Sequence, residues 1–249
     1  MSAPTDRHAW LIGASSGIGL AVGRLLAAHG WTVTLSARDE DRLRSAAAQI
    51  GARVEVLDVT DASAVAAAAA RVFEDVPPEL VMINAGDYEP MPLEGFDVAL
   101  FERLNRVNYL GPVNVLGAVL PRMRGTGHQC LITASASGYT GLPQAAPYSA
   151  PKAAAIHLAE ALQPEAARWG VRLRVINPGF VRSRLTDRNR FRMPGLMTPE
   201  AAARRIVDQL DRGGFEISFP RRLIWPLKVL RCLPYGLYFW LMQRYLVRG

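Results

Sequence analysis

The chain has 249 residues, of which 50% are hydrophobic and 20% charged, a balance typical of a folded globular protein and unlike that of a disordered one. Its net charge is +7, but six basic residues and no acidic residue lie between Arg221 and Gly249, so the excess is confined to a C-terminal tail and does not indicate a nucleic-acid-binding protein. Two cysteines form neither a disulfide framework nor a metal cluster, so we expect a cytoplasmic protein without a metal site.

Short apolar runs of strand length alternate with longer segments rich in alanine and leucine along the first 220 residues. We predict strands at 9–12, 32–36, 54–57, 80–83, 129–133, 172–176 and 215–219. We predict helices at 18–29, 39–50, 61–74, 100–124, 147–169 and 198–212. This repetition requires crossover connections and indicates an α/β, doubly wound fold with a seven-stranded, mostly parallel sheet and helices on both faces. Functional side chains should follow the strands, because ligands bind beyond the carboxyl ends of such sheets.

The segment GASSGIG, residues 13–19, joins the first predicted strand to the first predicted helix. Glycines let the backbone turn sharply and approach a phosphate closely, and the N–H groups at a helix start attract an anion. We interpret Gly13, Gly17 and Gly19 as the frame of a nucleotide-binding turn. The alternative is a tight turn without a ligand.

Arg38 follows the second predicted strand, where the adenosine ribose of a dinucleotide would lie. An arginine suits a 2′-phosphate, whereas an acidic residue suits the 2′-hydroxyl of NAD, so Arg38 favours NADP(H). Asp39 places a carboxylate beside this phosphate position, so NAD(H) is not excluded. The alternative for Arg38 is a surface side chain at the start of a helix.

Polar residues also follow the third and fourth predicted strands. Asp58 is a candidate acceptor for the adenine amino group, or else part of a helix cap with Thr60 and Asp61. Asn84 and Gly86, in the segment INAG, provide a second close approach of the backbone to a ligand.

Asn108, Ser135, Tyr148 and Lys152 are the candidate catalytic residues. Ser135 follows the fifth predicted strand, and Lys152 lies one helical turn after Tyr148 on the same face. Only two of the 29 basic residues are lysines, which suggests that this position requires an ammonium group; a solvated helix residue is the alternative. Pro151 is tolerated only in a first helical turn, so Tyr148 should lie near the helix start. A nearby ammonium lowers the pKa of a phenol toward the range useful for acid–base catalysis.

Together these motifs resemble the short-chain dehydrogenase/reductase family over nearly all of residues 7–220. The matching pieces are GASSGIG, the position of Arg38, LDV at 57–59, NAG at 84–86, VNYLG at 107–111, Ser135 thirteen residues before Tyr148, YSAPK at 148–152 and INPGFVRS at 176–183. The resemblance implies a Rossmann-type fold and a homodimer or homotetramer. It also implies an NADP(H)-dependent oxidoreductase that interconverts a carbonyl and an alcohol of a small molecule by direct hydride transfer.

The resemblance further implies a role for each site residue. Tyr148 would donate and accept the proton, Ser135 would orient the substrate oxygen, and Lys152 would lower the pKa of Tyr148 and hold the nicotinamide ribose. Asn108 would position a water that relays protons to the lysine. The implied cofactor-binding residues are Gly13, Ser15, Ser16, Gly17, Ile18, Gly19, Arg38, Asp58, Val59, Asn84, Ala85, Gly86, Tyr148, Lys152, Pro178, Gly179, Val181 and Ser183.

Three departures from the family pattern qualify these roles. Pro151 occupies a position that is more often serine, and Gln163-Pro164 is predicted to kink the catalytic helix. Ser16 stands where some NADP-using members carry a basic residue, so the NADP preference rests mainly on Arg38. Two other functional classes are alternatives: a regulatory protein that senses NADP(H) without turnover, against which the complete catalytic set argues, and a membrane scaffold that acts through the tail.

The expected catalytic domain, residues 1–220, includes a substrate-covering loop at 184–197. This loop mixes apolar and basic side chains, namely Phe191, Met193, Leu196, Met197, Arg188, Arg190 and Arg192. The mixture favours an apolar or lipid-like substrate with an anionic end. The alternative is an arginine-rich solvent loop.

The tail, residues 221–249, is unlike the short ending common in this family. Its longest uncharged run, 232–243, has 12 residues, fewer than the roughly 20 that span a bilayer. Amphipathic aromatic residues lie among its basic ones: Trp225, Tyr235, Tyr238, Phe239, Trp240 and Tyr245. Residues 223–249 are therefore predicted to lie on an anionic membrane, which would make the protein peripheral on the cytoplasmic face. The alternative is a tail packed on a partner subunit or over its own active site.

Overall fold

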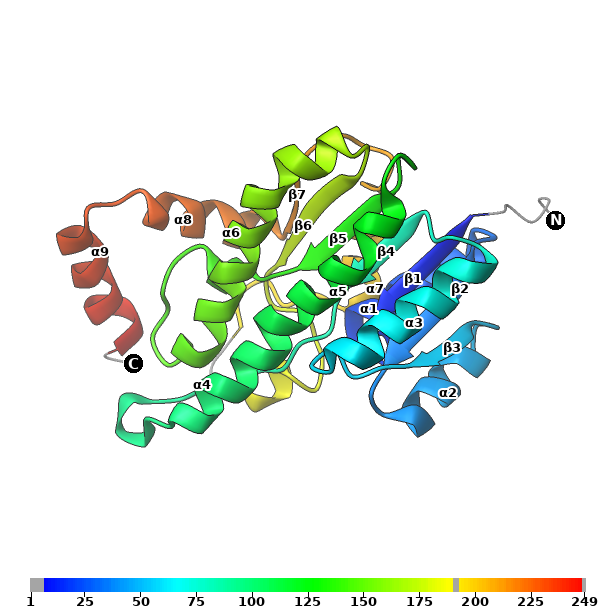
Figure 1. Ribbon diagram of the computed structural model, residues 1–249. Coiled ribbons are helices and arrows are strands. Elements are labelled where there is room, and N and C mark those ends of the chain that lie inside the picture. The colour runs from blue at the N-terminus through cyan, green and yellow to red at the C-terminus, as the bar shows by residue number, and fades with distance from the viewer. Residues whose placement is uncertain (1–6, 190–192, 248–249) are drawn as a thin grey trace.

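The computed structural model describes residues 7–189 and 193–247. In this part of the chain, strands form one sheet in the order β3-β2-β1-β4-β5-β6-β7, and every neighbouring pair is parallel (Figure 1). The strands are β1 His8–Ile12, β2 Thr32–Ala37, β3 Arg53–Val56, β4 Leu80–Ile83, β5 Gln129–Thr133, β6 Arg172–Pro178 and β7 Glu216–Phe219. The predicted α/β fold and its seven strands are confirmed, with every strand within two residues of its expected end.

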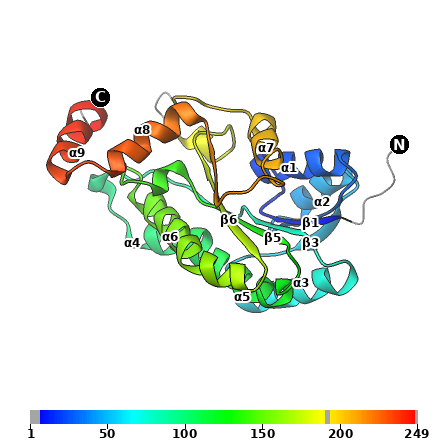
Figure 2. The ribbon, with the colours of Figure 1, turned by 90° about the horizontal axis from the view of Figure 1, so that it is seen from above.

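Helices cover both faces of the sheet. The α-helices are α1 Gly17–Ala28, α2 Glu40–Ala48, α3 Ala62–Asp75, α4 Val98–Asn105, α5 Gly111–Val119, α6 Ala146–Arg168, α7 Pro199–Val207, α8 Arg221–Arg231 and α9 Tyr235–Met242. Seen from above, α3, α5 and α6 lie on one face, and α1, α2 and α7 lie on the other (Figure 2).

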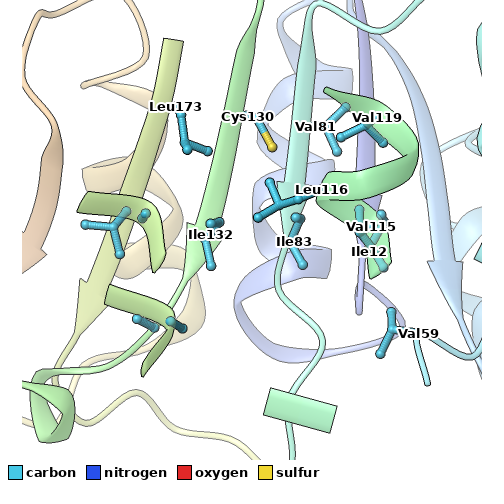
Figure 3. Close-up of a cluster of buried hydrophobic side chains, with 14 of the residues drawn as sticks. Ile12, Val59, Val81, Ile83, Val115, Leu116, Val119, Cys130, Ile132 and Leu173 are labelled. Atoms are coloured by element: carbon cyan, nitrogen blue, oxygen red, sulfur yellow. The ribbon is translucent and has the colours of Figure 1, made fainter. Parts of the chain in front are cut away.

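The central strands are buried on both faces, which explains why they read as continuous apolar runs. All residues of β1, β4 and β5 are buried. Alternate side chains of β1 serve the two faces, because Trp10 packs on the side of α3 and α5 whereas Leu11 packs on the side of α1. Figure 3 shows Val115 and Leu116 of α5 beside the strand residue Ile83. Packing on both faces of the sheet holds the carboxyl ends of the strands in place, and the candidate site lies at these ends.

The predicted helix 100–124 differs from the structure in a way that concerns the site. It consists of α4, a wide π-helical turn at Arg106–Leu110, α5 and a short 3₁₀ turn at Pro121–Met123. A π turn adds one residue per turn and redirects the side chains that it contains. Helix α6, which contains Tyr148 and Lys152, is continuous through Pro151 and Pro164, and Pro164 lies only four residues before its end.

The tail forms two helices, α8 and α9, which extend from one end of the molecule (Figures 1 and 2). Ile224 and Leu227 of α8 are buried in the same core cluster as α5 and α6. Helix α9 buries only Tyr238 and Met242. No helix in the described ranges is long and apolar enough to cross a membrane.

Candidate active site

The glycine-rich turn joins β1 to α1 and packs directly against the loop after β4. Gly13 has a φ of +83°, and a Cβ on it would lie 2.3 Å from the backbone nitrogen of Ala85. A Cβ on Gly19 would lie 2.7 Å from the carbonyl oxygen of Gly13. Neither position accepts a side chain without a shift of the backbone, so both need glycine.

The start of α1 is open to an anion. Ser16 is the N-cap, yet its side chain makes no hydrogen bond to the helix, and the first turn contains no acidic residue. The first N–H groups and the positive end of the helix dipole are therefore available to a phosphate. Ser15 and Ile18 belong to the same turn, and a Cβ on Gly17 would lie 3.9 Å from Cβ of Ser183. These residues fit the pyrophosphate of a dinucleotide.

The segment Asn84–Gly86 connects this turn to the catalytic residues. Asn84 Nδ2 donates to the Gly13 carbonyl oxygen at 3.0 Å. A Cβ on Gly86 would lie 3.0 Å from Oδ1 of Asn108 and 3.5 Å from Nζ of Lys152. The backbone therefore passes between the glycine turn and two of the predicted catalytic side chains.

Arg38 is exposed immediately after β2, at the predicted ribose position. The adjacent Asp39 is the N-cap of α2, and its carboxylate accepts a hydrogen bond from the Arg42 backbone nitrogen at 3.1 Å. The same carboxylate pairs with Nε of Arg42 at 3.1 Å. The Asp39 carboxylate, which would repel a 2′-phosphate, is thus directed toward α2. Arg38 remains as the basic group at the predicted ribose position.

A cavity of about 300 Å³ opens beside Arg38, between the ends of β2 and β3 and helix α4. Asp58 lines it, and its carboxylate accepts from the backbone nitrogen and the hydroxyl of Thr60 at 2.9 and 2.8 Å. The N-cap of α3 is Asp61, so the Asp58 carboxylate does not cap this helix. Val59 is buried, and its carbonyl accepts from Asn114 Nδ2 at 2.9 Å. The cavity lies at the predicted adenine position, and most of its lining is charged, with Glu102, Arg103 and Arg106 beside Arg38 and Asp58.

Ser135, Tyr148 and Lys152 lie together at the carboxyl edge of β5. Ser135 caps a short 3₁₀ turn, and its Oγ accepts from the Ser137 backbone nitrogen at 3.2 Å. Tyr148 is the third residue of α6, which agrees with the position expected from Pro151. The ammonium of Lys152 donates to the Thr133 carbonyl oxygen at 2.9 Å and lies 5.7 Å from the centroid of the Tyr148 ring.

Asn108 comes from the π turn and is fully buried. Its Nδ2 donates to the carbonyl oxygens of Asp87 and Leu104 at 2.8 and 3.0 Å, and its Oδ1 accepts from the Asp87 backbone nitrogen at 3.2 Å. The side chain therefore clamps the backbone just after Gly86. Its role in holding a water for Lys152 stays a prediction.

Burial dominates the ionisation of the catalytic pair. Desolvation raises the pKa of Tyr148 to about 12, although hydrogen bonding with Ser135 opposes this rise. Desolvation lowers the pKa of Lys152 to about 8. Attraction between the ammonium and a phenolate lowers the pKa of Tyr148, whereas burial has a larger effect of the opposite sign. Tyr148 is consequently a protonated phenol at neutral pH, and Lys152 is mostly an ammonium.

The implied nicotinamide-binding residues follow β6. Pro178 is its last residue, and Gly179 comes next. Val181 is buried and forms an isolated parallel bridge with Met197. Ser183 lies close to the glycine turn, as described above, so this segment reaches from the catalytic edge to the pyrophosphate position.

The predicted substrate loop is tied to the protein by its first half. Arg188 donates to the Tyr88 carbonyl oxygen and lies 3.3 Å from Oδ1 of Asp87. The hydroxyl of Tyr88 donates to Oδ1 of Asn189 at 2.7 Å. The charge of Arg188 is therefore matched within the protein rather than offered to an anionic substrate. Three further residues of this prediction, Arg190, Phe191 and Arg192, lie outside the described residues.

Sequence analysis missed a polar cluster around Glu216 on β7. The Glu216 carboxylate accepts hydrogen bonds from Nδ2 of Asn177 at 2.6 Å, from the hydroxyl of Tyr139 and from the ammonium of Lys228. Burial opposes ionisation of Glu216, but the hydrogen bonds outweigh it and lower its pKa. The signal that could have found the cluster is the rarity of lysine, because Lys228 is the second of only two. The ion pair of Lys228 with Glu216 links α8 to β7.

Comparisons with known proteins agree with this geometry. The sequence profile of the short chain dehydrogenase family matches residues 7–193. A Myxococcus xanthus protein described as an uncharacterized oxidoreductase is 34% identical over 246 residues, which cover 96% of this chain and 97% of that protein. An alcohol dehydrogenase from Thermococcus sibiricus, solved in complex with 5-hydroxy-NADP, shares 28% identity at a TM-score of 0.78 and covers 86% of this chain and 95% of its own.

One further solved structure matches nearly the whole length of this chain. LigD from Sphingobium, solved in its apo form, has a TM-score of 0.79 and covers 98% of this chain and 99% of its own. Its 22% sequence identity shows a common fold alone.

Proposed function

This chain belongs to the short-chain dehydrogenase family of oxidoreductases, and from that premise we propose that it is an NADP(H)-dependent enzyme that interconverts a carbonyl and an alcohol. The observation that carries the proposal is the meeting of Ser135, Tyr148 and Lys152 at one strand end, next to the glycine-rich turn. NADP(H), when bound there, supplies or accepts the hydride.

In carbonyl reduction the side chains of this chain handle the substrate oxygen. Ser135 Oγ donates a hydrogen bond to that oxygen and orients it beside Tyr148. Tyr148 then donates its phenolic proton, which a pKa of about 12 keeps in place at neutral pH. The ammonium of Lys152, 5.7 Å from the ring centroid, stabilises the phenolate that remains. In alcohol oxidation the phenolate takes the proton back.

Lys152 has a second task in this proposal. One of its three N–H donors is used by the Thr133 carbonyl oxygen at 2.9 Å, which fixes the direction of the side chain. The other two are available to the hydroxyls of the nicotinamide ribose. Asn108, which holds the backbone beside Lys152, would bind the water that returns a proton to this ammonium.

We expect Arg38→Ala to weaken NADPH binding by about one to two decades, because a charge-assisted contact with the 2′-phosphate is worth roughly 1.5–3 kcal/mol. NADH has no such phosphate, so its affinity should stay nearly the same. Dissociation constants from fluorescence titration measure both effects. The matched control is Arg44→Ala on the same side of the sheet, where Arg44 is paired with Glu40 at 2.6 Å. Equal weakening of both cofactors by Arg38→Ala would remove the reason to prefer NADP(H).

The substrate that we propose is an apolar, lipid-like carbonyl compound. The ring of Tyr88 packs edge-on against Tyr148 with centroids 5.0 Å apart, and a small apolar cluster of Met91, Leu100 and Leu104 adjoins Tyr148. Such walls favour apolar groups beside the reacting oxygen. A screen of NADPH oxidation over lipid, steroid and small aromatic carbonyls tests the class, and turnover of small polar carbonyls alone would exclude it.

We further propose that the enzyme is a homodimer or homotetramer. Exposed apolar side chains lie along the continuous α4–α5 segment, namely Val98, Leu110 and Val113. Sedimentation velocity measures the assembly directly, and a monomer at micromolar concentration would contradict this proposal.

A further inference from the structure

The C-terminal helices α8 and α9 pack on the body through a few buried or partly buried side chains, which include Leu223 and Leu230 of α8. Helix α8 is held by the buried side chains of Ile224 and Leu227 and by the ion pair between Lys228 and Glu216. Helix α9 is held by Tyr238, whose hydroxyl donates to the Gly141 carbonyl oxygen, and by the buried Met242. The remaining sides of both helices face outward at one end of the molecule (Figures 1 and 2).

The outward sides of α8 and α9 carry many large apolar side chains that are exposed to solvent. Tyr235 is 78% exposed, and Trp240 in the following turn is 56% exposed. The other exposed apolar residues of the two helices and of the turn after them are Trp225, Val229, Leu237, Phe239 and Tyr245. Many large apolar side chains exposed on two adjacent helices of a folded protein favour a site of interaction. We name these seven residues the aromatic face.

Basic side chains accompany the aromatic face without any acidic neighbour in the tail sequence. Arg221, Arg222, Arg231 and Arg244 are exposed, and no ion pair joins them to another side chain within the part of the chain that the structure describes. Lys228 differs, because Glu216 already neutralises it. The surface therefore offers four unmatched positive charges next to aromatic rings, which complements a surface that is both anionic and apolar.

A bilayer with anionic headgroups is both anionic and apolar, whereas a second copy of this surface is apolar but basic. In a two-fold contact the same patch meets itself, which would bring the four arginines together with no carboxylate between them. Helices of 11 and 8 residues are too short to cross the membrane. Tyrosine and tryptophan rings with basic neighbours instead suit the boundary between headgroups and acyl chains.

The tail also contacts the segment that joins two of the predicted catalytic residues. Gly141, which accepts the hydrogen bond from Tyr238, belongs to the segment between Ser135 and Tyr148. The cluster of Glu216 and Lys228 also receives Tyr139, which is four residues after Ser135. A protein docked through α8 and α9 would therefore present this segment to the membrane surface.

We propose that α8 and α9 form a docking surface for anionic membranes, and that this places the active site where long-chain lipid carbonyl compounds enter from the bilayer. The docking rests on the aromatic face and the four arginines alone. The choice of lipid substrate rests in addition on the proposed oxidoreductase function. The two parts can fail separately, because vesicle binding needs no turnover.

Vesicle co-sedimentation without substrate tests the docking. Full-length protein should bind phosphatidylglycerol–phosphatidylcholine vesicles more tightly than pure phosphatidylcholine vesicles. At about 1 M salt, where the Debye length is about 3 Å, binding should weaken but persist, because apolar burial is not screened. Changing Arg221, Arg222, Arg231 and Arg244 to glutamine should lower the affinity for anionic vesicles by roughly fivefold per charge. The preference for anionic over neutral vesicles should then disappear. Phe239→Ser with Trp240→Ser should lower binding to both vesicle types.

The matched control variants change residues at, or just after, the C-terminal end of α6. Trp169→Ala removes a tryptophan that is 39% exposed, and Arg168→Gln with Arg172→Gln removes two exposed arginines. These variants should bind vesicles as the unchanged protein does. Equal loss in the controls, or no binding of the unchanged protein to anionic vesicles, would overturn the docking proposal. Dissociation of the oligomer by Phe239→Ser with Trp240→Ser, at unchanged vesicle binding, would likewise overturn it and identify the tail as an assembly arm.

The lipid-substrate part has its own readout. The rate of NADPH oxidation with a long-chain ketone embedded in anionic vesicles should fall in the arginine-to-glutamine variant, whereas the rate with a water-soluble ketone should not change. If the arginine variant loses vesicle binding but reduces the embedded ketone at the unchanged rate, the membrane is not the route of substrate entry.

Discussion

Tyr148→Phe is expected to lower kcat for carbonyl reduction by at least about 100-fold, because the phenylalanine ring has no proton to give and general acid catalysis contributes about 10²–10⁴-fold. NADPH binding should weaken by no more than about tenfold, since at most one neutral hydrogen bond is lost. The ring itself and its edge contact with Tyr88 are kept, so the fold should be unaffected. Steady-state kinetics and fluorescence titration with NADPH separate the two effects.

Tyr245→Phe is the matched control for this change. It removes a phenol that is 69% exposed in the last helical turn and that belongs to none of the predicted site residues, and kcat should not change. Retention of most reductase activity by Tyr148→Phe would refute the assignment of Tyr148 as the proton donor. A parallel loss of NADPH affinity and activity would instead make Tyr148 a cofactor-binding residue.

Lys152→Met is expected to abolish turnover and yet to stabilise the fold at neutral pH. Burial lowers the pKa of Lys152 from 10.5 to about 8, so keeping this ammonium in the folded protein is unfavourable. One pKa unit corresponds to about 1.4 kcal/mol, which puts the stabilisation by methionine at up to about 3 kcal/mol. Thermal unfolding at pH 7 should therefore show a higher Tm for the variant than for the unchanged protein.

The pH dependence of this stabilisation has a definite sign. Below pH 8 the lysine is charged in both the folded and the unfolded chain, and the unfavourable burial is felt in full. Between pH 8 and 10.5 the folded chain binds fewer protons than the unfolded one, so the stability of the unchanged protein rises with pH. The advantage of Lys152→Met should consequently shrink over that window and vanish above it. An advantage that grows with pH would contradict the burial effect.

The other lysine supplies the control for Lys152→Met. Lys228 is paired with Glu216, so Lys228→Met leaves a half-buried carboxylate without its ammonium and should lower Tm. Two substitutions of the same type are thus expected to shift Tm in opposite directions. Equal shifts of the same sign would show that the loss of a lysine, rather than its surroundings, determines the result.

The sheet and the positions of its seven strands could be predicted because each strand is a short apolar run between two turn signals. The strand β5, for example, is buried along its whole length and is followed directly by Ser135. The spacing of Ser135, Tyr148 and Lys152 could also be predicted, since it depends on one strand end and one turn of helix. These parts of the account follow from local sequence and from the periodicity of helices and strands.

Contacts between distant segments decided what could not be predicted. The π turn that redirects Asn108 has no local signal, whereas the tight contact of Gly111 with Val59 at its end comes from packing. The pKa of Tyr148 depends on burial by several elements, so a sequence argument from the neighbouring ammonium alone had the wrong sign. Helix α9 was not predicted because it is apolar on nearly every side and shows no amphipathic period.

The most direct test of the proposed reaction is the fate of the hydrogen at the reactive carbon of the nicotinamide. NADPH that carries deuterium there should be offered with each carbonyl compound of the screen, and the product analysed by mass spectrometry. We expect one deuterium on the carbon of the new alcohol group, and no such product with Tyr148→Phe. If NADPH binds but no carbonyl compound of any class acquires deuterium, the protein is a cofactor sensor and not the oxidoreductase proposed here.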